Sequence, residues 1–594
     1  MASPTTTHTA VRRPLDALRF DMAGPPALNR VVADHLRRLG ARARDREGED
    51  IRLRGGEFAP VTARTAWGAA GSGVEDEATA QAVTGVMAVH GRRHGTPRGL
   101  GADYLATATG VLTVQGLLAG LIGQVRGGPA TQVRTTADRA GLLAVSQYLA
   151  AAGADEPEAV EAAPGGPPFT SADGVLFELE TLDPGDWAAF WRALEAPADA
   201  IRAGWRPFQF RYATACAPFP EVLHEVTRRH PWARIRQAAG RSGAEVCRLR
   251  TLAERAGEDD GADPWTLRAL SAGYAASAAA AGRPPTPAAD RPLAGLTVLE
   301  AGRRIQAPLA AHLLGLLGAR VTRIEPPGGD PLRGMPPACS GVSARWLALN
   351  RGKEAVEIDI KSPADRNRLR ELAADADVFL HNWAPGKAAE LELDAEHLAA
   401  VNPSVVYAYT GGWADRLDDA PMGTDFMVQA RTGVGEAVHP AGEPPVPSLM
   451  TLLDVLGGLH GTEAVLAGLL LRERTGQGVR VDSSLLGAAD TLLAPALHRA
   501  AAGAEPRRPA GFRHPLATSD GWIVPSDDSA AAAAAYDVRG MCTEDALDLL
   551  RSHGLTATAV TTDLSALHHD PRLSGSISRD AHGAPVVPDP WSFA

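Results

Sequence analysis

The sequence predicts an α/β fold, a doubly wound parallel sheet, that is built twice in one chain. Short β-rich runs alternate with helical patterns, which is typical of parallel strands joined by helices. Blocks of sequence also recur at a fixed distance, which indicates an internal duplication. With 594 residues, 45% of them hydrophobic and 22% charged, the chain can bury a sizeable core and is long enough for several domains.

The duplication is read from matching residues. Residues 13–15, Arg-Pro-Leu, recur at 291–293, a shift of 278, and Gln81-Ala82 recurs as Gln429-Ala430, a shift of 348. Shared composition does not keep a fixed offset, so we interpret the match as a tandem repeat. The change of shift means that the first copy has lost the counterpart of roughly residues 325–404.

This predicts three parts: a degenerate first copy at 1–274, an Ala/Pro-rich linker at 275–290, and a second copy at 291–594 whose shortened small domain begins near 512. No GxGxxG motif follows the first strand of the second copy, so dinucleotide binding is unsupported. The expected strands of the second copy are 296–300, 321–325, 355–360, 378–380 and 405–409, and the expected helices are 307–317 and 362–373.

Charge and composition exclude several partners. Acidic residues outnumber basic ones, 70 to 59, and the net charge of -11 argues against binding to a nucleic-acid backbone. No uninterrupted apolar run reaches the about 18 residues of a membrane span, and the N-terminus lacks a signal-peptide core, so a cytoplasmic protein is expected. The four cysteines are too scattered for a zinc site, and no metal is expected.

The second copy carries a series of ordered sequence blocks. They are PLAGLTVLEAG, LLGARVTRIEPPGGDPLR, LNRGKEAVEIDIKSP, ADVFLHNWAPG, VNPSVVYAYTGGW, GTDFMVQARTG and LLLRERTGQGVRVDSSLLGAA. They resemble the class III CoA-transferases of the CaiB/BaiF type, a family with formyl-CoA transferases, carnitine CoA-transferases and α-methylacyl-CoA racemases. The resemblance implies a Rossmann-like large domain, a smaller α+β domain, two interlocking units, and coenzyme A, acyl-CoA and a carboxylic acid as small-molecule partners.

Asp454 matches the aspartate that is the nucleophile of the transferases. A carboxylate suits this role because it can attack a thioester carbonyl, form a mixed anhydride and be regenerated. The alternative for an Asp before Val-Leu-Gly-Gly is a helix N-cap. The register of the repeat places Ala106 at this position in the first copy, and a methyl group cannot be a nucleophile. We therefore expect an inactive first copy that serves as a built-in partner, an intramolecular pseudo-dimer; whether whole chains form a homodimer stays open.

Asp425 lies in Gly-Thr-Asp, where the resemblance to the racemases places Gly-His-Asp with a catalytic base. Racemisation needs a base on each face of the α-carbon. Thr424 replaces the histidine, and His397 and His439 remain possible second bases. The first copy has Glu77 at the position of Asp425.

CoA carries phosphate groups, so its site should offer cations and backbone amides. The chain has only three lysines. By resemblance, Lys353 contacts the nucleotide end, Gln306 follows the first strand, and Asn382 lies near the pantetheine. Arg323 and Arg333 match positions where relatives often place phosphate-binding residues.

Two departures from the family bear on the site. Ala384 and Glu390 stand where relatives place arginines, so either Lys387 compensates or the affinity for CoA is reduced. No glycine-rich loop closes over the site, so either the first copy covers it or the chemistry differs. The leading hypothesis is a CoA-transferase; the alternatives are an acyl-CoA racemase or isomerase, and a non-catalytic acyl-CoA-binding pseudoenzyme.

Overall fold

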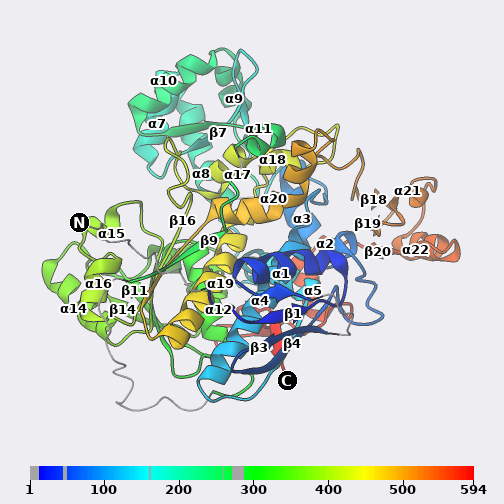
Figure 1. The fold of residues 1–594 in the computed structure, drawn as a ribbon. Helices are drawn as coiled ribbons and strands as arrows, with labels where there is room; N and C mark the ends of the chain where they lie inside the picture. The colour runs from blue at the N-terminus through cyan, green and yellow to red at the C-terminus, as the bar shows by residue number, and fades with distance from the viewer. Residues whose placement is uncertain (1–12, 45–49, 160–161, 259, 271–286) are drawn as a thin grey trace, which may run out of the picture.

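A computed structural model describes residues 13–44, 50–159, 162–258, 260–270 and 287–594. It is an α/β structure with two large sheets, as the alternation of elements predicts (Figure 1). Residues 275–286, most of the predicted linker, lie outside the described residues.

The sheet of the second copy is parallel apart from one edge strand. The order is β14-β11-β10-β15-β16-β17-β9, and only β9 runs antiparallel to its neighbour. The strands are β10 (Thr297–Ala301), β11 (Arg320–Glu325), β14 (Glu354–Glu357), β15 (Val378–His381), β16 (Val406–Gly411), β17 (Val479–Ser484) and β9 (Trp265–Ala269). The strands predicted from the sequence are therefore found, displaced by at most a few residues.

Helices cover both faces of this sheet because successive strand residues point to opposite sides. Val298 joins the core beneath α12 (Gln306–Leu316) and α19 (Leu452–Thr475). The next residue, Leu299, joins the separate core beneath α14 (Pro363–Ala374) and α16 (Ala395–Val401). Both predicted helices of the second copy, which correspond to α12 and α14, are present.

The sheet of the first copy is smaller. Its order is β2-β1-β3-β4-β5-β23, with β1 (Arg19–Asp21), β2 (Arg42–Ala43), β3 (Ile51–Gly55), β4 (Phe58–Ala66), β5 (Gln132–Thr136) and β23 (Trp591–Phe593). The antiparallel β3–β4 pair lies between β1 and β5. It occupies the part of the sheet where the second copy has β15 and β16. The stretch missing from the first copy is the one that holds β14, β15, α14 and α16.

The two copies share their strand register and their central helices. Arg19 pairs with Arg42 between β1 and β2, and the same pairing recurs 278 residues later, between Thr297 and Arg320. The helix α4 (Tyr104–Val125) starts 348 residues before α19, and the two helices pack against each other in the middle of the molecule. Both are long and apolar enough to cross a membrane by length and composition, yet the apolar window of each is entirely buried within the protein.

Each copy gives its last strand to the sheet of the other copy. The strand β9, from the end of the first copy, pairs with β17, and Trp265 lies opposite Ser483. The strand β23, from the end of the second copy, pairs with β5, and Trp591 lies opposite Thr135. Neither large sheet is complete without the other copy.

Two smaller units project from the large sheets. The first holds β6 (Phe169–Thr170), β7 (Leu176–Glu180), β8 (Glu245–Arg248), α7 (Pro184–Ala193), α8 (Ala198–Thr214), α9 (Glu221–Arg228) and α10 (Trp232–Ser242) around an aromatic core. Figure 1 shows it at the top of the view, and we call it the aromatic unit. The second, after residue 512, holds β18 (Leu516–Ala517), β19 (Trp522–Pro525), β20 (Ala557–Ala559), α21 (Ala530–Ala533) and α22 (Thr543–Ser552).

Candidate active site

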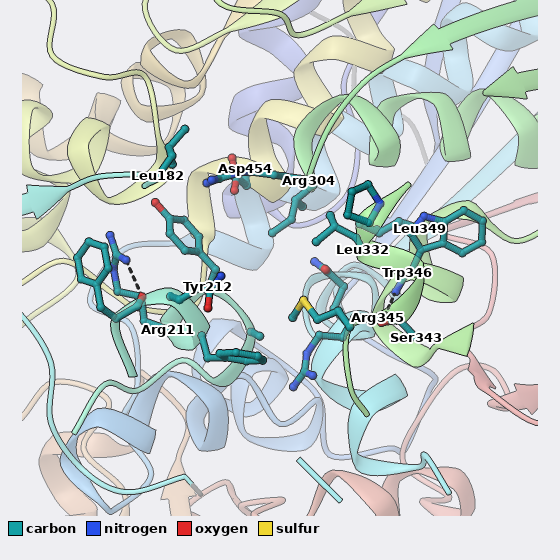
Figure 2. Close-up of a pocket in the computed structure, with 18 of the residues that line it drawn as sticks. Leu182, Arg211, Tyr212, Arg304, Leu332, Ser343, Arg345, Trp346, Leu349 and Asp454 are labelled. Carbon is teal, nitrogen blue, oxygen red and sulfur yellow. Dashed lines mark hydrogen bonds between the residues drawn. The ribbon is translucent and has the colours of Figure 1, made fainter. Parts of the chain in front are cut away.

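A cavity of about 400 Å³ lies between the aromatic unit of the first copy and loops and helices of the second copy. Each copy supplies half of its lining. The first copy contributes Gln147, Glu180, Thr181, Leu182, Trp205, Phe208, Gln209, Phe210, Arg211, Tyr212 and Ala213, and the second copy contributes Arg304, Ile305, Pro331, Leu332, Met335, Ser343, Arg345, Trp346, Leu349, Asn350 and Asp454. Figure 2 shows the predicted nucleophile, Asp454, on the wall between Leu182 and Arg304.

Asp454 is the third residue of α19 and is not its N-cap. The N-cap is Thr451, whose backbone takes the left-handed conformation, with φ at 51°. Such a conformation is costly for a residue other than glycine, and it turns the chain sharply into the helix. The Asp454 carboxylate makes no hydrogen bond within the described part of the chain and lies in the first helical turn, where the helix dipole favours negative charge.

Asp425 holds this helix end in place. Its Oδ2 accepts a 2.7 Å hydrogen bond from the backbone amide of Asp454, and its Oδ1 accepts a 2.5 Å hydrogen bond from Gln429 Nε2. Asp425 starts α17 (Asp425–Thr432), is fully buried and does not line the cavity. Burial raises its pKa to about 6.

The first copy repeats this arrangement with Ala106 in the place of Asp454. Glu77, at the start of α2 (Glu77–Val83), accepts hydrogen bonds of 2.8 Å from the amides of Leu105 and Ala106 and one of 2.8 Å from Gln81 Nε2. These residues stand 348 positions before Asp425, Leu453, Asp454 and Gln429. An acidic side chain therefore binds the amides at the helix start in both copies, a contact that we call the clasp, while a carboxylate at the third helical position stands only in the second copy.

Charges around Asp454 act on its pKa in opposite directions. Burial raises this pKa well above the usual value, and the carboxylates of Asp425 and Glu180 raise it further. The guanidinium of Arg304 lowers it. Arg304 is exposed, lies over the ring of Tyr212 at 5.4 Å and has no acidic partner within hydrogen-bonding distance among the described residues.

Glu180 brings a second carboxylate to the cavity from the first copy. It ends β7, forms an ion pair of 3.0 Å with Arg211 and accepts hydrogen bonds from the hydroxyl groups of Tyr212 and Thr424. Thr424 stands where the resemblance to racemases places a histidine, and its hydroxyl is bound to Glu180 at 2.8 Å. Glu180 was not predicted as a site residue, because no local pattern links β7 to residues more than 240 positions away.

The six residues predicted to bind CoA lie outside the cavity. Gln306 is buried at the start of α12, and its Nε2 donates to the carbonyl of Gly411 at 3.3 Å. Asn382 follows β15 and is bound to the backbone of Arg303 through both its Oδ1, at 2.8 Å, and its Nδ2, at 2.9 Å. Asn382 thus fixes the turn that carries Arg304 to the cavity wall.

Arg323 and Lys353 are buried in a charge cluster around Glu300. Lys353 Nζ donates to Glu300 at 2.9 Å and to the carbonyl of Pro308 at 2.8 Å, and burial lowers its pKa to about 8. Arg323 pairs with Glu300 and, at 2.5 Å, with Asp330. Both basic side chains are only 3% exposed, so in this structure their charge is neutralised inside the protein.

The other two predicted cations are nearer to solvent. Arg333 lies over the ring of Trp346 at 3.8 Å and pairs with Glu325 at 2.8 Å. Lys387 pairs with Glu390 at 2.7 Å on an exposed helical turn. Both retain solvent access that Arg323 and Lys353 lack.

The histidines considered as second bases do not reach the cavity. His397 pairs with Asp394 at 2.7 Å on the outer face of α16. His439 is buried next to His90 and bonded to Glu443 at 3.3 Å. Neither residue lines the cavity with Asp454.

Comparisons with known proteins agree with the sequence blocks. The profile of CoA-transferase family III matches residues 62–281 and 293–558. Succinyl-CoA:glutarate CoA-transferase of Mus musculus is 35% identical over 202 residues, 33% of this chain and 46% of that protein. Acetyl-CoA:oxalate CoA-transferase of Acetobacter aceti is 35% identical over 236 residues, 39% of this chain and 60% of that protein.

A crystal structure of a CAIB/BAIF family protein from Brucella suis matches 50% of this chain and 95% of its own, with a TM-score of 0.43 and 24% identity. This chain spans about half the length of the curated relatives that it matches. The family profile covers most of the chain and matches both copies. The chain belongs to CoA-transferase family III.

Proposed function

We propose that this protein transfers CoA between carboxylic acids, with Asp454 as the nucleophile. The observation that carries the proposal is the Asp454 carboxylate on the wall of a cavity of about 400 Å³, without a hydrogen-bond partner among the described residues. An unpaired carboxylate in a mostly apolar site is weakly solvated, and once ionised it is free to attack a thioester carbonyl. The resemblance of the sequence blocks, which places Asp454 at the position of the family's transferase aspartate, also supports the proposal.

In the first half-reaction the Asp454 oxygen attacks the thioester carbonyl, the C–S bond breaks, and CoA leaves as a thiolate. The thiolate then attacks the Asp454 carbonyl of the mixed anhydride and expels the donor carboxylate, which leaves an aspartyl-CoA thioester. In the second half-reaction the acceptor carboxylate displaces the thiolate, and the thiolate attacks the acceptor carbonyl. The new acyl-CoA forms and the Asp454 carboxylate returns.

Arg304 can offset the repulsion between the carboxylates that meet in this scheme. Each half-reaction places an anionic carboxylate next to Asp454 and near Glu180, and like charges at short range repel each other. Arg304 is the guanidinium on the cavity wall that has no acidic partner at hydrogen-bonding distance. We assign it to the binding of the leaving and entering carboxylates, with its N–H groups as donors.

The racemase alternative is less well supported by the contacts. Both oxygens of Asp425 accept hydrogen bonds, and Asp425 does not line the cavity. The hydroxyl of Thr424, in the place of the second base, is bound to Glu180. These contacts support a positioning role for Asp425, which fixes the start of α19.

The proposal includes an intramolecular pseudo-dimer. The exchanged strands β9 and β23 and the cavity walls shared by both copies support it. In the second copy, the parallel strands follow the order 3-2-1-4-5-6, which supports a Rossmann-like large domain. The first copy then covers the reactive centre in place of a glycine-rich lid.

For CoA we propose a path along the end of the sheet at which the carboxyl ends of the central strands β10 and β15 lie. Arg333 and Lys387, which retain solvent access, are the predicted residues kept for direct contact, and Asn382 and Gln306 are assigned to shaping this path through their bonds to the backbone. Arg323 and Lys353 are assigned to holding this end of the sheet through Glu300, because their charges are already neutralised. A cytoplasmic location, where acyl-CoA is available, completes the proposal.

Mass spectrometry tests the mechanism. The full chain is incubated with acetyl-, succinyl- and glutaryl-CoA, which the names of the relatives suggest, and with longer acyl-CoA esters. Hydroxylamine or borohydride then traps the activated carboxyl group, and the modified peptide is mapped. Modification of Asp454, lost in Asp454→Asn, is expected. An unmodified protein that exchanges the α-hydrogen in deuterated water indicates the racemase, and silence in both assays indicates a binding protein.

A further inference from the structure

We propose that the acyl group handled at Asp454 is bulky and uncharged, of the size of an aryl or branched alkyl group, and that short dicarboxylic acids are poor substrates. This inference rests on the proposed transferase function. It follows from three features of the cavity: its apolar walls, the pairing of its cations, and an exposed leucine at its edge.

The walls beyond Asp454 are formed mostly by apolar and aromatic side chains, with Gln147, Gln209 and Asn350 as uncharged polar members. The aromatic unit contributes Trp205, Phe208, Phe210 and Tyr212, and the second copy contributes Ile305, Leu332, Met335, Trp346 and Leu349. In Figure 2, Tyr212 lies on one side and Leu332, Leu349 and Trp346 lie on the other. A flat or branched apolar group buries surface against both sides, and this burial favours its binding.

Two of the three arginines on the cavity walls already form ion pairs with acidic residues of the protein. Arg211 is buried and pairs with Glu180 at 3.0 Å. Arg345 is 5% exposed, pairs with Glu158 and donates to the carbonyl of Pro336 at 3.2 Å. Arg304 remains, and it stands next to Asp454, where the reacting carboxylate needs it.

A dicarboxylic acyl group would bring a second negative charge to the far part of the cavity. Burying a carboxylate without a counter-ion is costly. The acid would have to displace Glu158 from Arg345, and the displaced Glu158 would lose its own partner. An uncharged acyl group avoids both the burial of an unpaired carboxylate and the loss of the ion pair between Glu158 and Arg345.

The third feature is Leu182, next to Asp454 on the cavity edge in Figure 2. Its side chain is 57% exposed, and only one other large hydrophobic residue, Val401, is exposed to a similar degree in the described part of the chain. Leu182 directly follows two residues of the cavity wall, Glu180 and Thr181, so the backbone holds it at the opening. An apolar acyl group would cover it.

A competition experiment tests the inference. The full chain is incubated with equimolar phenylacetyl-, hexanoyl-, glutaryl- and succinyl-CoA, and rapid gel filtration removes the unbound thioesters, which hydroxylamine would cleave directly. Hydroxylamine then releases the protein-bound acyl groups as hydroxamates, which mass spectrometry quantifies. We expect phenylacetyl and hexanoyl hydroxamates to exceed glutaryl hydroxamate by at least about tenfold, since hydrophobic discrimination of this size needs about 1.4 kcal/mol. Equal or preferred capture of glutaryl or succinyl overturns the inference while the transferase proposal stands; absence of every hydroxamate, with Asp454 unmodified, contradicts the transferase proposal itself.

Variants locate the preference in the cavity. Leu182→Asp is expected to lower phenylacetyl capture about tenfold, and Val401→Asp, at the end of α16 and away from the cavity, serves as the matched control and leaves it unchanged. Glu158→Gln frees Arg345 and is expected to raise glutaryl capture. Binding of phenylacetyl-CoA and glutaryl-CoA to Asp454→Ala, measured by calorimetry, reports the same order without turnover. Unchanged selectivity in both Leu182→Asp and Glu158→Gln overturns the inference.

Discussion

The carboxylate of Asp425 accepts a 2.7 Å hydrogen bond from the backbone amide of Asp454, so one acidic residue fixes the helix end that presents the other. Glu77 makes the same contact with Ala106 in the first copy, at 2.8 Å. The duplication therefore supplies an internal control, in which the same contact exists with Asp454 in one copy and with Ala106 in the other.

Asp425→Asn is expected to lower the free energy of unfolding by about 1–3 kcal/mol, because an amide cannot accept every hydrogen bond that the buried carboxylate accepts. Chemical denaturation measures this loss. The charge of Asp425 raises the pKa of Asp454, so the variant is also expected to shift the acid limb of kcat/KM to lower pH.

Glu77→Gln is the matched variant. It removes the same kind of clasp from α4 and is expected to cost a similar amount of stability. The acid limb of kcat/KM should stay where it is. A pH profile that moves equally in both variants would contradict the separate roles of the two clasps.

Glu180→Gln and Arg304→Gln are expected to move the same pH profile in opposite directions. Attack requires ionised Asp454, so kcat/KM rises with pH through the pKa of this group. Glu180 raises that pKa and Arg304 lowers it. The acid limb should therefore shift to lower pH in Glu180→Gln and to higher pH in Arg304→Gln. Steady-state kinetics between pH 5 and 9 measure the shifts, and shifts of the same sign would refute this account of the site.

The buried side chain of Glu178 is expected to make the free energy of unfolding depend on pH. It is fully buried, neither carboxylate oxygen has a hydrogen-bond partner among the described residues, and burial raises its pKa from 4.5 to about 8. The folded state therefore holds this proton more tightly than the unfolded state. The stability associated with this group is fully present below pH 4.5 and is lost as the pH rises to about 8.

Glu178→Gln removes this titration. Its unfolding free energy at pH 8.5 should exceed that of the natural protein by an amount on the order of a few kcal/mol, and the two should converge near pH 4.5. Urea denaturation across this range measures both curves. A constant difference at all pH values would mean that the variant acts through packing alone.

Substitution of Trp591 or Trp265 tests how much the exchanged strands β23 and β9 contribute to stability. Trp591 is buried, lies opposite Thr135 and donates a 2.7 Å hydrogen bond from its indole to the carbonyl of Leu112. Trp265 holds the corresponding place opposite Ser483. Either change to Ala should lower the unfolding free energy by about 3–5 kcal/mol, because it opens a large cavity in a core. Thermal denaturation measures the loss.

The two tryptophan variants also separate strand exchange from local packing. Since each strand belongs to one copy and completes the other copy's sheet, each variant should expose both copies to limited proteolysis. Cleavage confined to the copy that carries the substitution would contradict the mutual dependence of the two sheets. The transferase reaction should be weakened in both variants, because the cavity wall is shared.

Local and repeated patterns were sufficient to predict much of the fold and its family. Runs such as 297–301 and 378–381 are short, apolar and followed by helical patterns, so each reveals a buried strand by itself. The fixed shift of 348 aligned Ala106 with Asp454, and both stand at the third position of their helices. The role of Asp454 as the nucleophile is a prediction of the sequence blocks.

Tertiary structure decided which residues surround Asp454. Glu180 and Tyr212 come from the first copy and reach the cavity only because the aromatic unit folds over the second sheet. The tertiary structure also decided the partners of Arg323 and Lys353, whose side chains are buried and pair with Glu300. The sequence pattern determined strands, helices and their repetition because these depend on neighbours along the chain; the partners of a charge depend on contacts between distant segments, which periodicity does not encode.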